Sequence, residues 1–93
     1  MAFGLYFRPT GFTPALYDEA IKQLSAAGAG FGSVPGRTFH CAMEVEGLIH
    51  VFDVYESMEQ FEKFGQTLVP ILAKLGVDPG QPMVSPIRKR ENG

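Results

Sequence analysis

The chain has 93 residues, of which 45% are hydrophobic and 19% are charged, and its formal net charge is −2. This length fits one small domain, and the apolar content excludes intrinsic disorder. The slightly acidic balance gives no attraction to nucleic acid and no apolar run approaches the length of a membrane span, so we expect neither as a partner.

The first third of the sequence predicts a strand, a helix and a loop. Apolar residues alternate with others over residues 3–8, which is typical of a strand, and Pro9 ends it. A helix is predicted from Thr13, a good N-cap that a proline follows, to about Gly28. The segment 28–36, GAGFGSVPG, contains four glycines and a proline, so we expect a loop there.

Residues from about 37 to 56 predict a hairpin with its turn at Glu46-Gly47. A two-residue loop at that point sets the register of the two strands. Counting outward from the turn, this register pairs His40 with Asp53, the best acid/base candidates in the chain.

A three-residue loop over residues 45–47 is the alternative for this turn. In that register His40 would share a face with His50, and Asp53 would leave that face. We prefer the two-residue loop because it separates polar from apolar side chains better.

The last third predicts a helix and a strand. Ser57 caps a helix that should end near Gly76, and Pro70 inside it predicts a kink or a break. A turn signal at 78–80 then precedes an edge strand over residues 82–88. The stripe predicted to be buried on the helix is Phe61, Phe64, Leu68, Leu72 and Leu75.

The resulting order of strand, helix, strand, strand, helix, strand is that of a ferredoxin-like α+β fold. In this fold an antiparallel four-stranded sheet carries both helices on one face. We expect one domain over residues 1–88 and a solvated tail over 89–93. The single cysteine, Cys41, has no internal disulfide partner, which predicts a buried thiol and a reducing, cytoplasmic location.

The two faces of the hairpin differ in composition, and we expect the more apolar one to lie beneath the helices. The other face is half apolar and carries ionisable groups, which predicts a cavity shared with a second copy of the chain, in a homodimer through the open sheet face. The face assigned to the helices carries Phe39, Cys41, Met43, Val45, Leu48, His50, Phe52 and Val54. The face assigned to the partner carries Thr38, His40, Ala42, Glu44, Ile49, Val51, Asp53 and Tyr55.

The chain resembles the dimeric α/β-barrel superfamily, and within it the small members akin to antibiotic-biosynthesis monooxygenases. The resemblance rests on the element order, the segments FHCA, HVFDVYES and LVPILAKLG, and the phenylalanine-rich start of the second helix. It implies a barrel formed by the sheets of two subunits. Relatives include cofactor-independent oxygenases, haem-degrading enzymes, lactone isomerases, polyketide cyclases and ligand-sensing domains.

The resemblance does not extend to haem binding. The haem-degrading branch uses a histidine on the second helix and a nearby tryptophan, whereas residues 57–76 contain no histidine and the chain contains no tryptophan. No spacing of histidine, cysteine and carboxylate residues demands a metal either. We therefore expect no metal or organic cofactor.

Two functional hypotheses follow. In the first, His40 is a general base oriented by Asp53, in a monooxygenase, isomerase or cyclase acting on a small aromatic or polyketide-like substrate. In the second, the protein is a ligand-binding or accessory dimer in which the same cavity binds a small molecule without turnover. The alternative for the pair itself is a structural cross-strand ion pair at the dimer interface. The candidate ligand-binding residues are Tyr6, Arg8, Glu44 and Tyr55.

Overall fold

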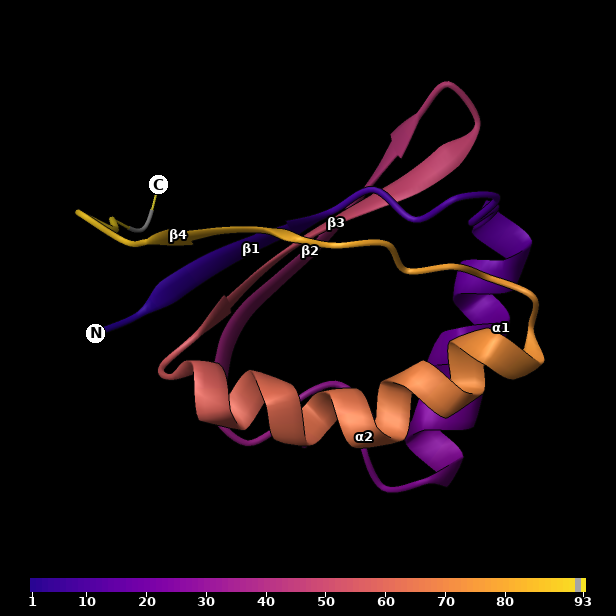
Figure 1. Cartoon of the computed structure of the whole chain (residues 1–93), viewed down its shortest axis with the longest axis horizontal. Helices are drawn as coiled ribbons and strands as arrows, with labels where there is room; N and C mark the ends of the chain where they lie inside the picture. Colours follow the sequence, from indigo (N-terminus) through magenta and orange to yellow (C-terminus); the bar gives the residue numbers. More distant parts are fainter. Residues whose placement is uncertain (92) are drawn as a thin grey trace.

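The structure, a computed structural model, describes residues 1–91 and 93. Its elements are β1 (Phe3–Phe7), α1 (Pro14–Ala26), β2 (Arg37–Val45), β3 (Leu48–Tyr55), α2 (Met58–Lys74) and β4 (Met83–Pro86). The strands form one sheet in the order β2-β3-β1-β4, and every neighbouring pair is antiparallel. Figure 1 shows both helices on one side of this sheet, with both chain termini at the same end. The ferredoxin-like α+β fold is thereby confirmed.

The helices begin and end at the signals that the sequence carries. Thr13 accepts a hydrogen bond from the Leu16 amide at 3.2 Å, and Ser57 accepts one from the Gln60 amide at 3.3 Å. Gly28 follows α1 with a φ of 81° and lets the chain reverse, so that the Ala29 amide reaches back to a carbonyl in the last turn. Both caps predicted for the N-termini are confirmed.

Pro70 lies within α2, and the helix continues past it to Lys74. A break there, one of the two outcomes expected, does not occur. Proline removes one backbone donor and crowds the preceding turn, but packing of the apolar face against the sheet keeps the helix in register. The side chains of Phe64 and Leu72, on either side of the proline, are both buried.

The hairpin adopts the two-residue loop. Glu46 and Gly47 have φ angles of 52° and 82°, the left-handed values of a type I′ turn, and His40 pairs with Asp53 as predicted. The ladder departs from the expected register only at its far end. A bulge between Arg37 and Phe39 sets Arg37 opposite the last residue of β3.

The predicted assignment of the two hairpin faces is wrong. The helices cover the face that includes His40 and Asp53, whereas the face assigned to them is open. Both faces are rich in apolar residues, so composition alone did not decide which one lies inside. The covered residues of β3 are Ile49, Val51, Asp53 and Tyr55, each less than 9% exposed.

The hydrophobic core fills the space between this face and the two helices. Both β1 and β3 contribute to it, as do Phe12 before α1 and Val77 after α2. Among the described residues, no helix is long and apolar enough to cross a membrane. The buried cluster consists of Leu5, Phe7, Phe12, Ala20, Leu24, Val34, Ile49, Val51, Tyr55, Phe64, Leu72 and Val77.

The C-terminal segment returns along the sheet. The Ile87 amide donates to the carbonyl of Ala2, and the exposed Arg90 donates to the Thr38 hydroxyl at 2.8 Å and to the Thr38 carbonyl at 3.2 Å. The Arg90 guanidinium also lies over the ring of Phe39, 5.8 Å from its centroid. The basic residues after β4 are therefore exposed, and one of them is docked on the start of β2.

Candidate functional site

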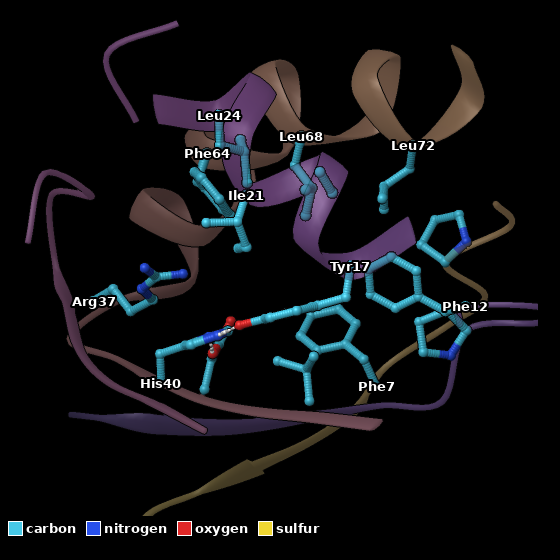
Figure 2. Close-up of a pocket in the computed structure, with 15 residues that line it drawn as sticks. Phe7, Phe12, Tyr17, Ile21, Leu24, Arg37, His40, Phe64, Leu68 and Leu72 are labelled. Carbon is cyan, nitrogen blue, oxygen red and sulfur yellow. Dashed lines mark hydrogen bonds and ion pairs between the residues drawn. The ribbon is translucent and has the colours of Figure 1, made fainter. Parts of the chain in front are cut away.

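A cavity of about 60 Å³ lies between the sheet and the two helices. Its wall is largely apolar, and Figure 2 shows Arg37 and His40 at one end and Phe12 and Leu72 at the other. The polar groups therefore gather at one end of an apolar space, as is usual in sites for small organic molecules. The lining residues are Phe7, Pro9, Phe12, Tyr17, Ala20, Ile21, Leu24, Arg37, His40, Val51, Asp53, Phe64, Leu68, Leu72 and Pro79.

Three of these residues form a hydrogen-bonded chain. His40 Nδ1 lies 2.6 Å from Asp53 Oδ1, and the Tyr17 hydroxyl lies 2.7 Å from His40 Nε2. The Asp53 and His40 side chains are only 6% and 16% exposed. The tyrosine and imidazole rings are nearly parallel, at 5°, and Figure 2 shows them joined edge to edge. These hydrogen bonds link Tyr17 on α1 to His40 on β2 and Asp53 on β3.

With Asp53 ionised and His40 neutral, the chemistry of the three groups sets the direction of their protons. An ionised carboxylate only accepts hydrogen bonds, so Nδ1 of His40 carries the proton that Asp53 receives. Nε2 is then the basic nitrogen, and the Tyr17 hydroxyl donates to it. Burial raises the pKa of Tyr17, while the Arg37 charge opposes this rise. Tyr17 therefore stays protonated as a donor at neutral pH.

Arg37 lines the polar end of the cavity, and Phe31 lies beside it outside the wall. The Phe31 ring, from the glycine-rich loop, has its centroid 5.3 Å from that of His40, and the Arg37 guanidinium lies 5.9 Å from the Phe31 centroid. The same guanidinium lies 5.6 Å from the centroid of Phe64 on α2. Two aromatic rings thus hold this charge in place.

Tyr55 is fully buried next to this group, beneath α2. Burial raises the pKa of its hydroxyl, the Asp53 charge adds to the rise, and Arg37 opposes it. Among residues 1–91 and 93 the hydroxyl has no partner within hydrogen-bonding geometry. Arg37 opposes the rise both through its charge and through a polar contact with the hydroxyl that falls outside ordinary hydrogen-bond geometry.

The predicted ligand-binding residues do not join His40 in one cavity. Tyr6 and Arg8 follow the alternation of β1 onto the open face, and Arg8 is exposed. Glu44 is exposed near the hairpin tip, and Tyr55 lies under α2 outside the cavity wall. Tyr6 and Arg8 thus lie on the face opposite His40, whereas Glu44 and Tyr55 share its face but do not line this cavity.

A second tyrosine-histidine pair lies on the open face. The Tyr6 hydroxyl is 2.9 Å from Nδ1 of His50, and their rings meet edge to face. No carboxylate within 4 Å accompanies this pair among residues 1–91 and 93. It therefore lacks the group that would orient the imidazole and stabilise its charged form.

The sequence did not single out Tyr17 and Arg37. Tyr17 lies in the apolar stripe of α1, where a tyrosine is usually a core residue, and Arg37 opens β2 with no motif around it. The signal available in the sequence was the position of Tyr17 on the apolar face of α1. A tyrosine directed at the sheet becomes a site residue once His40 is known to lie beneath the helix.

Two solved structures of other proteins share the fold of this chain. No family model and no curated protein matches the chain. A crystal structure from Chloroflexus aurantiacus J-10-fl, of a protein provisionally named antibiotic biosynthesis monooxygenase, matches all of both chains with 17% identity and a TM-score of 0.64. A second, from Caulobacter crescentus CB15 and with the same provisional name, has 21% identity and a TM-score of 0.60 over 97% of this chain and 91% of its own. At these identities the matches show the shared fold.

Proposed function

We propose that this protein is a small enzyme that removes a proton from a small organic substrate without a metal or organic cofactor. The observation that carries the proposal is the Tyr17–His40–Asp53 chain at the polar end of an apolar cavity. A base oriented by a buried carboxylate is the arrangement that general acid/base catalysis uses. The two structural neighbours are provisionally named monooxygenases, and oxygenation is one of the reactions that such a proton removal could begin.

In this mechanism His40 is the base and Asp53 positions it. As the substrate gives its proton to the Tyr17 oxygen, Tyr17 passes its own hydroxyl proton to Nε2 of His40. The products of the step are a substrate anion and an imidazolium, which the Asp53 carboxylate stabilises. The anion can react with dioxygen, take up a proton at another carbon, or attack a carbonyl, which correspond to oxygenation, isomerisation and cyclisation.

The size of the cavity restricts the substrate. Sites for drug-sized ligands usually measure about 300 to 1,000 Å³, whereas this cavity measures about 60 Å³. A small molecule, or the reacting end of a longer one, matches this space. A fused-ring polyketide would require the helices to move away from the sheet, so we favour a small substrate.

Ligand binding without turnover is the second candidate function. It is favoured by the Tyr17 hydroxyl, which already occupies Nε2 of His40, the atom that a substrate would otherwise reach. In that case Tyr17 seals the pair from the ligand, and the cavity serves as a receptor.

We also propose that two copies of the chain associate through the open sheet face. Large apolar side chains there remain accessible, including Phe39 at 44%, Met43 at 39% and Met83 at 67% exposure. Monomeric soluble proteins rarely leave large apolar patches uncovered. Replacing Phe39 and Met43 by glutamate should give a folded monomer in light scattering. An unchanged oligomeric state would contradict this interface.

The enzymatic proposal is tested by turnover in a panel of variants. Small hydroquinones are tested for dioxygen uptake and small enolisable ketones for deuterium incorporation from D₂O. His40→Ala should lower the rate about 100-fold or more, as expected for loss of a general base. Tyr17→Phe should also lower it if the proton passes through the hydroxyl. His50→Ala is the matched control, because this histidine pairs with a tyrosine on the other face.

Circular dichroism establishes that each variant is folded before its rate is compared. If His40→Ala retains the wild-type rate, His40 is not the base and the mechanism is wrong. Binding of the same compounds without turnover would support the receptor function instead.

A further inference from the structure

Arg37 reaches the cavity because of the bulge at the start of β2. In a regular ladder Thr38 would lie opposite Tyr55 and share its face, and Arg37 would turn to the open side. The bulge between Arg37 and Phe39 instead sets Arg37 opposite Tyr55. Bulges often redirect a side chain beside a functional site. Here the result is a guanidinium at the polar end of the His40 cavity (Figure 2).

The guanidinium has unused hydrogen-bonding capacity. Arginine carries five N–H donors, and in residues 1–91 and 93 the Arg37 side chain has no carboxylate within 4 Å and only a contact with the Tyr55 hydroxyl that falls outside ordinary hydrogen-bond geometry. Asp53, the buried carboxylate of the cavity, is engaged with His40. The aromatic rings of Phe31 and Phe64 fix the position of the charge without supplying an acceptor.

A second unsatisfied group lies beside it. The Tyr55 hydroxyl is fully buried, and within residues 1–91 and 93 its contact with Arg37 does not reach ordinary hydrogen-bond geometry. Buried polar atoms are nearly always paired in folded proteins, so an orphan of this kind needs an explanation. Tyr55 lies outside the cavity wall, so its hydroxyl does not balance the Arg37 charge on the cavity side, whereas an anionic oxygen held by Arg37 would supply that counter-charge.

We propose that Arg37 is the anion-binding residue of this cavity and that the ligand is a small carboxylate. The planar fork of arginine matches a carboxylate in a bidentate arrangement. With the carboxylate on Arg37, the apolar part of the ligand points among the aromatic residues of the wall, and its acidic proton lies near Tyr17. This inference rests on the proposed function, since it assigns the substrate class of the same site.

Two probes of the same shape and different charge test the inference. Propionate and propionamide are titrated into the wild-type protein while the NMR signals of the His40 ring are followed. Charge-assisted hydrogen bonds in a partly buried site should make propionate bind about tenfold or more tightly than propionamide. Arg37→Met should remove this difference by weakening propionate binding, with propionamide binding unchanged.

Two further variants complete the design. Arg37→Lys keeps the charge and loses the fork, so propionate affinity should fall part of the way. Arg88→Met makes the same substitution as Arg37→Met at an exposed arginine away from the cavity, and both affinities should stay at wild-type values. A folded Arg37→Met protein is verified by its circular dichroism spectrum.

The outcomes separate this inference from the proposed function. If both probes bind with equal affinity and shift the His40 signals, the cavity is a ligand site and the role of Arg37 is wrong. If Arg37→Met binds propionate as tightly as the wild type, the inference is again overturned. If neither probe shifts the His40 signals, the carboxylate assignment fails, and failure of the turnover assay as well would remove the proposed function.

Discussion

The contact between His40 and Asp53 gives the sharpest test of the site's energetics. Asp53 is 4% exposed, and within residues 1–91 and 93 His40 is the one side chain that forms a hydrogen bond with it. Removing the imidazole by His40→Ala leaves a buried carboxylate unpaired, which typically costs about 3 to 5 kcal/mol. Asp53→Asn removes the charge, so the cost of leaving that position unpaired is much smaller.

The two substitutions should therefore be strongly non-additive. The double variant should be more stable than the sum of the single losses by about 1.5 to 3 kcal/mol, the value of a hydrogen bond to a charged group. Urea unfolding at pH 7.5, at one protein concentration for all variants, measures each free energy. A control cycle that combines His50→Ala with Asp53→Asn should be additive, because His50 lies on the other face of the sheet.

Additivity within about 0.5 kcal/mol in the His40 cycle would refute the reasoning. It would mean that the carboxylate is hydrated or protonated in the folded protein, and that the 2.6 Å contact contributes nothing to stability. A strongly coupled control cycle would refute it as well, since the coupling would then not be specific to the contact.

Further predictions concern the buried tyrosine and the turn glycine. Tyr55→Phe removes an unpaired hydroxyl and should raise the free energy of unfolding by about 1 kcal/mol in urea titrations; a loss of that size would mean that the hydroxyl has a partner. Because the raised pKa of Tyr17 and of Tyr55 lies above the ordinary value of 10.0, the folded protein retains protons that the unfolded chain loses, so the contribution of these two tyrosines to stability should be constant below about pH 10 and fall above it. Tyr55→Phe should flatten that fall, and an unchanged slope between pH 9 and 11 would contradict the assignment. Gly47→Ala, at a φ of 82°, should cost about 1 kcal/mol and lower Tm by about 4 to 8 °C in calorimetry, whereas Gly65→Ala in the middle of α2 should raise Tm, and the opposite order would contradict the turn.

The fold was predictable because its signals are local. The side chains of Thr13 and Ser57 cap the helices by accepting hydrogen bonds from backbone amides three residues further along the chain. The spacing of apolar residues along each element indicates whether it is a helix or a strand. The pairing of His40 with Asp53 was also predictable, because a two-residue loop at Glu46-Gly47 fixes every pair in the hairpin.

The candidate site was predictable only in part. Its histidine and aspartate come from the hairpin register, but Tyr17 enters from α1 and Arg37 through a bulge that no sequence motif announces. The role of each depends on contacts between elements far apart in the chain, and such contacts have no local signature.

The sequence by itself therefore determined the order of elements, their caps and the partner of His40. Only the tertiary structure decided which face of the sheet the helices cover. The physical reason is that both faces of the hairpin are apolar enough to be buried, so the choice depends on how the helices pack and not on the composition of the strands. That choice encloses the His40–Asp53 pair inside the subunit, brings Tyr17 to Nε2, and leaves Phe39 and Met43 on the open face.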